Sequence, residues 1–149
     1  MTESLIDTDI LSFYFKGEQQ VVKKFNDYLN KFDVINISII TYYEILGGLK
    51  FKKAERQITE FEDFVANNTI IHISEESVKI AADIYANLRL QGITIGTSDI
   101  LIAGIAIEND LRLITNNEKH FESINGLDRE LEKVKITTFN VGITCLFCC

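Results

Sequence analysis

The side chains best suited to chemistry are acidic or amide groups that follow apolar segments: Asp7, Asp9, Glu44, Asp99 and the pair Asn116–Asn117. Carboxylate and amide oxygens are the ligands that Mg²⁺ and Mn²⁺ prefer in proteins. Carboxylates crowded at one place raise one another's pKa unless a cation is present. If the fold brings these groups together, the chemistry they predict is binding of a hard divalent cation.

Each of these residues also has a local explanation. Glu44 completes a Thr-x-x-Glu pattern typical of a capping box, and Asp99 stands where it would favour a helix dipole. We expect Asp9 to cap the first helix, and Asn116–Asn117 could form an ordinary turn. These local roles do not explain why one edge would collect the acids, and Asp99 begins an almost wholly apolar helix where a charge needs a partner.

Apolar strands that alternate with amphipathic helices would position these groups. We expect strands at Ser4–Ile6, Val34–Ile40, Ile70–Ile73, Leu111–Thr115 and Lys135–Phe139. We expect helices over Val21–Phe32, from Thr41 onward, over Phe51–Val65 after the Gly47-Gly48 pair, over Val78–Leu88 with Gly92 near its end, and from Thr97 through a buried segment ending at Ile107. Residues 116–133 are expected to form a loop.

In the helix over Val78–Leu88, the expected inward stripe consists of Val78, Ala81, Ala82, Tyr85 and Leu88. The alternation of strands and helices predicts an α/β protein, a three-layer α/β/α sandwich with a mostly parallel central sheet. The carboxyl ends of parallel strands lie along one edge, where open sheets of this class bind ligands.

Composition limits the function further. The 149 residues suit one domain, and the net charge of −7 argues against nucleic-acid binding through a broad basic surface. The start of the sequence has no signal-peptide pattern, so we expect a cytoplasmic protein with no membrane partner. All three cysteines fall in the last five residues, so we divide the chain into a domain at residues 1–140 and an apolar, cysteine-containing tail at 141–149.

Four segments carry a resemblance to a known family: LIDTDIL at 5–11, TYYEI at 41–45, SDILIA at 98–103 and LITNNEKHF at 113–121. In this order the chain resembles the PIN-domain ribonucleases, especially VapC-type toxins of toxin–antitoxin modules, from about residue 4 to residue 139. Asp7, Glu44 and Asp99 match the acidic triad of that family. Asn117 matches a fourth position, which is Asp in some members and Asn in others.

The resemblance implies a PIN-like fold and a Mg²⁺- or Mn²⁺-dependent endoribonuclease that acts on single-stranded RNA. The four matched residues would be the metal ligands and catalytic residues, with Thr8 and Thr115 orienting them through hydrogen bonds. It also implies an RNA substrate, a cognate antitoxin of a type II toxin–antitoxin pair and a homodimer. We expect Lys50 and Arg89 to bind substrate, with Lys52, Lys53 and Arg56 as further basic candidates.

Two other functions stay open. Asp7-Thr8-Asp9 resembles the Asp-x-Asp motif of haloacid-dehalogenase-type phosphatases, although Glu44 and Asp99 would then be unused. A PIN-like module that binds RNA or protein without cutting is the second alternative. His120 could be a general acid or base, but we expect a structural histidine beside Phe121, and we expect the aromatic residues to form core and oligomer contacts rather than a base-stacking platform.

Overall fold

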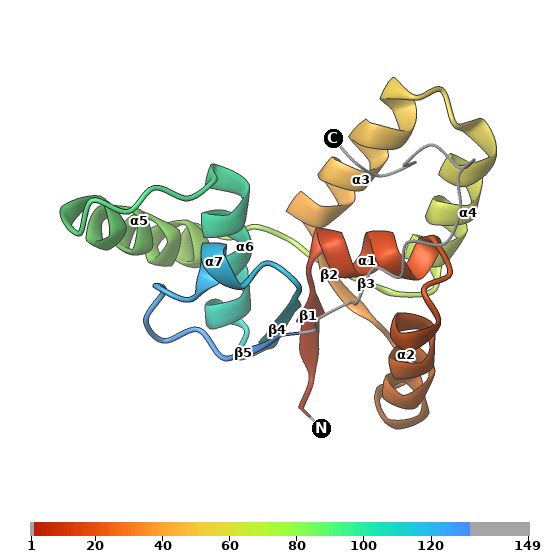
Figure 1. Cartoon of the computed structure of the whole chain (residues 1–149), viewed down its shortest axis with the longest axis horizontal. Coiled ribbons are helices and arrows are strands. Elements are labelled where there is room, and N and C mark those ends of the chain that lie inside the picture. Colours follow the sequence, from red (N-terminus) through yellow and green to blue (C-terminus); the bar gives the residue numbers. More distant parts are fainter. Residues whose placement is uncertain (1, 132–149) are drawn as a thin grey trace.

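A five-stranded, wholly parallel sheet organises the described part of the chain, residues 2–131, in this computed structural model (Figure 1). The strand order is β3-β2-β1-β4-β5, so β1 is central. The elements in chain order are β1 Ser4–Ile6, α1 Thr8–Phe15, α2 Gln19–Phe32, β2 Asn36–Ser38, α3 Ile39–Phe51, α4 Glu55–Ala66, β3 Thr69–Ile71, α5 Glu75–Leu90, α6 Thr97–Glu108, β4 Arg112–Thr115, α7 Glu118–Phe121 and β5 Arg129–Leu131.

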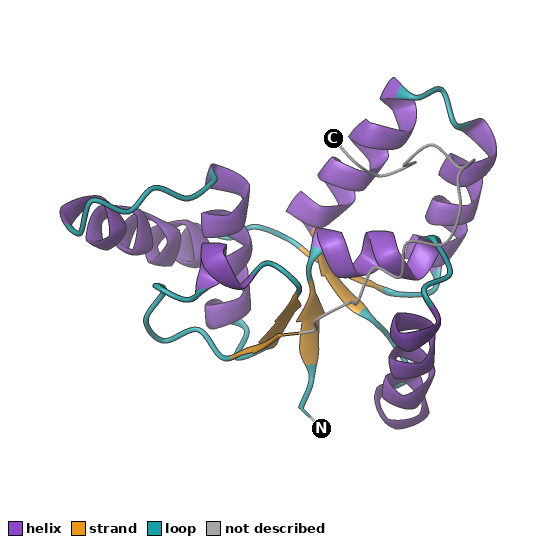
Figure 2. Cartoon of the chain, viewed as in Figure 1, coloured by secondary structure: helices purple, strands orange, loops and turns teal. Residues whose placement is uncertain are grey.

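Helices cover both faces of the sheet, because successive residues of each strand point to opposite sides. Leu5 and Leu113 join one apolar core with α5, α6 and α7, whereas Ile6 and Ile37 join a second core with α1 to α4. Figure 2 shows the strands lying between these two groups of helices. The predicted three-layer α/β/α sandwich with its parallel sheet is confirmed.

Strand β2 is shorter than predicted, and the helix after it begins earlier. Ser38 ends the strand and caps α3 by accepting a hydrogen bond from the backbone N–H of Thr41 at 2.9 Å. The expected capping box between Thr41 and Glu44 is therefore wrong, since Thr41 is already inside the helix and Glu44 lies in its second turn. The expected helix over Phe51–Val65 is also wrong at its start, because α3 continues through Gly47 and Gly48 and ends at Phe51.

The amphipathic stripe of α5 differs from the prediction by part of a turn. The residues that α5 buries are Ser77, Ala81, Ile84 and Leu88. Of the expected stripe, Val78, Ala82 and Tyr85 are exposed, and only Ala81 and Leu88 are buried. Ser77, which forms the capping box of α5 with Ser74, is on the buried side, and the next residue, Val78, faces solvent.

Helix α6 is buried on most sides, as predicted, and packs closely on α5. Gly104 is the point of closest approach, since a Cβ atom there would lie 2.5 Å from the carbonyl oxygen of Ser77. Within residues 2–131, none of the helices combines the length and apolar character needed to cross a membrane.

The segment predicted as a loop over residues 116–133 contains both α7 and β5. Strand β5 pairs with β4, with Thr115 opposite Leu131. The predicted strand Lys135–Phe139 and the predicted tail at 141–149 lie outside the described residues.

Candidate active site

Asp7 is the most deeply buried carboxyl group at the carboxyl edge of the sheet, with only 5% of its surface exposed. It follows β1 and caps α1, with Oδ1 accepting a hydrogen bond from the Thr8 N–H at 2.8 Å. Oδ2 accepts a second hydrogen bond, at 2.7 Å, from the hydroxyl of Thr115 at the end of β4. The expectation that Asp9 caps this helix is wrong, because β1 ends at Ile6 and the next residue takes the capping position.

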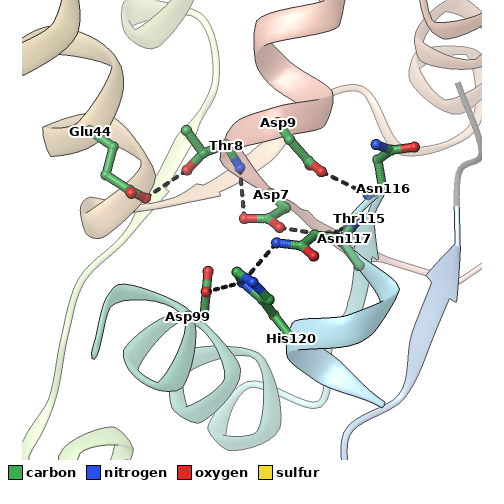
Figure 3. Close-up of polar contacts among 9 residues, drawn as sticks. All are labelled: Asp7, Thr8, Asp9, Glu44, Asp99, Thr115, Asn116, Asn117 and His120. Carbon is green, nitrogen blue, oxygen red and sulfur yellow. Dashed lines mark hydrogen bonds and ion pairs between the residues drawn. The ribbon is translucent and has the colours of Figure 1, made fainter. Parts of the chain in front are cut away.

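Glu44 reaches the same edge from α3. Its Oε1 accepts a hydrogen bond from the Thr8 hydroxyl at 2.8 Å (Figure 3). The Thr8 hydroxyl oxygen also lies 3.3 Å from that of Thr41. Thr8 thus links α1 to α3 and holds the carboxylate of Glu44 by a hydrogen bond. Thr115 does the same for Asp7.

Asp99 comes from the first turn of α6 and meets His120 of α7 (Figure 3). The two atoms Asp99 Oδ2 and His120 Nδ1 are 2.6 Å apart, and Asn117 Nδ2 lies 2.7 Å from the same ring nitrogen. His120 is therefore a site residue that the sequence analysis assigned to a structural role beside Phe121. Its spacing of three residues from Asn117 was the available signal, because residues at that spacing meet across one turn of helix.

Asp9 joins the loop after β4 to the first turn of α1. Its Oδ2 accepts a hydrogen bond from the backbone N–H of Asn116 at 3.0 Å, and its Oδ1 accepts one from Ile10 at 2.6 Å. The backbone N–H of Asn117 donates to the Thr115 hydroxyl at 3.0 Å. Six elements therefore supply the site. Hydrogen bonds join β4 and the loop after it to β1 and α1, and they join α1 to α3 and α6 to α7.

Burial and mutual repulsion raise the pKa values of three of these carboxyl groups. Burial, followed by the charge of Asp9, raises the pKa of Asp7 to about 8. Burial raises the pKa of Asp9 to about 6, and also raises the pKa of Glu44 above its usual value. The charge of Asp99 contributes to all three increases, so the four acids act on one another electrostatically.

This donor set fits a hard divalent cation. It is rich in carboxylate oxygens, and a cation would relieve the repulsion that raises the pKa values. Within residues 2–131, no three His, Cys, Asp or Glu side chains already surround a common point at ligand distance.

The two predicted substrate-binding residues have different positions. Lys50 lies on the exposed side of α3, and because the helix is continuous it stands six residues, about 9 Å, along the axis from Glu44. Arg89 lies in the last turn of α5, a helix that extends away from α3 in Figure 1. Its guanidinium lies 5.3 Å from the ring centre of Tyr85 and donates to the Thr94 hydroxyl at 3.4 Å, so these contacts of Arg89 are with α5 and the segment that follows it.

A family model described as PIN domain matches residues 4–127. This chain belongs to the PIN-domain family. The PIN domain is 31% identical over 131 residues to "Ribonuclease VapC2" of Haemophilus influenzae and 32% identical over 132 residues to "tRNA(fMet)-specific endonuclease VapC" of Shigella flexneri. Each match covers 87% of this chain and 98% of the relative, which confirms the resemblance to VapC proteins.

Solved structures agree with this assignment. VapBC2 from Rickettsia felis, bound to a DNA fragment from its promoter, matches the PIN domain with a TM-score of 0.78 and 29% identity, covering 87% of this chain and 98% of the other. A toxin-antitoxin complex from Klebsiella pneumoniae matches with a TM-score of 0.66 and 25% identity, covering 84% and 95%. Membership of the PIN family removes the phosphatase alternative.

Proposed function

We propose that this PIN domain is a metal-dependent endoribonuclease and the toxin of a type II toxin–antitoxin pair. The observation that carries the proposal is the convergence of Asp7, Glu44 and Asp99, from β1, α3 and α6, at one edge of a parallel sheet. The relatives named as a ribonuclease and a tRNA-specific endonuclease support the reaction class, and the structural neighbours that contain VapBC or toxin-antitoxin complexes support an antitoxin partner. A homodimer remains a prediction.

The residues that would hold Mg²⁺ or Mn²⁺ are Asp7, Glu44, Asp99 and Asn117. A bound metal ion at such a site supplies Lewis-acid activation of a water molecule and neutralises charge on a phosphodiester. Thr115 and the α1 N-terminus hold Asp7 in one orientation, and Thr8 holds Glu44. Asp99 of α6 and Asn117 of the loop after β4 both lie within 2.7 Å of His120 Nδ1, which donates to Asp99 when it is protonated and accepts from Asn117 when it is not.

The test is cleavage of total cellular RNA by the purified, antitoxin-free protein with Mg²⁺, with Mn²⁺ or with EDTA. We expect discrete fragments only with metal, and none from Asp99→Asn. The matched control is Asp83→Asn, which makes the same change on the exposed side of α5 and should cleave like the wild type.

Fragments formed by Asp99→Asn at the wild-type rate, or in EDTA, would contradict the proposed mechanism. Intact RNA in every lane, from protein shown to be folded, would favour the module that binds RNA or protein without cutting.

A further inference from the structure

One exposed face of α3 runs from Glu44 to the end of the helix. At 100° per residue, Tyr43, Glu44, Gly47, Lys50 and Phe51 fall within about 120° of one another. The helix buries the opposite side, at Thr41, Ile45 and Leu49. In Figure 1 this helix rises away from the start of α1 toward the turn before α4. Its exposed face therefore begins at the acidic edge and leads away from it.

The two aromatic rings on this face are unusually open to solvent. Tyr43 is 71% exposed and Phe51 is 80% exposed. Between them lies Gly47, where an added Cβ would meet nothing within 4 Å. A glycine inside a helix costs about 1 kcal/mol relative to alanine, and the packing of α3 gives no steric reason for it. Gly47 therefore leaves the helix surface without a side chain between the two exposed rings.

Positive charge gathers at the far end of the same face. Lys50 and Lys53 are exposed there, and the end of α1 adds Lys16 beside Lys52. Burial, followed by the charge of Lys52, lowers the pKa of Lys16, whereas the charge of Glu18 raises it. In a chain with a net charge of −7, this corner is locally basic. Lysines near helix C-termini interact favourably with the dipole, but that effect does not account for an exposed phenylalanine among them.

We infer that the exposed face of α3 binds single-stranded RNA beside the acidic edge. This face consists of Tyr43, Gly47, Lys50 and Phe51. The inference rests on the proposed nuclease function and adds the path of its substrate. Bases stack on Tyr43 and Phe51, and Lys50 and Lys53 contact phosphates. Exposed aromatic rings interleaved with basic side chains are the usual means of binding single strands without sequence preference.

The spacing suits this arrangement. Phe51 lies seven residues from Glu44, about 10 Å along the axis, and on nearly the same side of the helix. A strand of a few nucleotides covers that length. Tyr43 and Phe51 are therefore not among the aromatic residues that form the core. A protein partner is the competing occupant, but the basic corner favours a polyanion.

The test measures binding separately from cleavage. Fluorescence anisotropy of a fluorescein-labelled oligouridylate of about 12 nucleotides is followed in an Asp99→Asn background, at low and moderate salt. We expect Phe51→Ala to weaken binding by about 5- to 100-fold, and Phe51→Trp to retain it. Lys50→Gln should weaken binding and lower the salt dependence by about one counterion.

The matched control is Tyr85→Ala, which removes a half-exposed aromatic ring from α5 and should bind like the parent protein. Equal affinity for the parent and Phe51→Ala overturns the inference, as does a parent that does not bind the oligonucleotide at low salt. The inference is also overturned if Phe51→Ala is no longer captured by co-expressed antitoxin while its RNA binding is unchanged. That result would assign the exposed face of α3 to a protein interface. The proposed nuclease function fails by a different result, which is intact cellular RNA with the wild-type protein and metal.

Discussion

Replacing Asp7 by asparagine should make the metal-free protein more stable while it abolishes cleavage. The carboxyl group is almost completely buried, and its pKa of about 8 lies far above the reference value of 3.8. Between these two pKa values, each pH unit costs the folded state about 1.4 kcal/mol. At pH 7 the cost is therefore about 4 kcal/mol, which asparagine avoids because it carries no charge.

Asparagine also weakens the hydrogen bond from Thr115, at a cost of about 1–2 kcal/mol. The net increase in the free energy of unfolding should be about 2 kcal/mol, or about 4–8 °C in Tm for a chain of this size. The direction with pH follows from the raised pKa. Wild-type stability should fall as pH rises from about 4 to about 8, so the advantage of the variant should be small near pH 4 and largest near pH 8.

Urea unfolding of both proteins in EDTA, at several pH values, measures this difference. Asp83→Asn, on the exposed side of α5, is the control and should leave stability unchanged. Adding Mg²⁺ or Mn²⁺ should reduce the difference in the free energy of unfolding between Asp7→Asn and the wild type. A cation that binds the wild-type carboxylate stabilises the folded state of the wild type. A variant no more stable than the wild type at pH 7, or a gap that is the same at pH 4 and pH 8, would refute the assignment of this cost to a buried charge.

Three further substitutions test the packing and the site. Gly104→Ala should lower the free energy of unfolding by about 1–3 kcal/mol, because the added Cβ would meet the Ser77 carbonyl oxygen. Gly48→Ala should raise the free energy of unfolding by about 0.5–1 kcal/mol, because the added Cβ would meet nothing within 4 Å. Thermal melts that rank the two variants in the opposite order would contradict the close approach of α5 and α6. His120→Ala should lower both Mn²⁺ affinity, measured by titration calorimetry, and the cleavage rate by about 10–100-fold, since Asp99 loses the contact that orients it; unchanged values for both would show that the contact at 2.6 Å has no part in the site.

The fold could be predicted from sequence because the signals for it are local. Strand β1 and the buried helix α6 stand out as short apolar runs with polar residues at their ends, and the parallel sheet follows from their alternation with helices. The predicted helix and strand boundaries were wrong where a capping hydrogen bond or tertiary packing outweighs secondary-structure propensity. Ser38 starts α3 inside a β-branched run, and Gly47-Gly48 does not interrupt the helix because tertiary packing at Leu49 outweighs glycine propensity.

The acids of the site were predictable because each lies just after a strand or within the first two turns of a helix at one edge of the sheet. The histidine was not, because its role depends on α7 turning toward α6, and the sequence analysis assigned that segment to a loop. The position of Arg89 could not be predicted either. It depends on the direction in which α5 leaves the sheet, and the sequence pattern of the helix does not encode that direction.

The central place of β1 has a consequence for how this protein becomes active as it is synthesised. Asp7 receives its N–H bond from the residue that follows it, but its other support, Thr115, lies 108 positions further along the chain. The backbone N–H of Asp7 likewise donates to Ile114 at 3.0 Å. A growing chain on the ribosome therefore carries Asp7 without the strand that supports it. Cleavage activity should appear only after β4 has been synthesised.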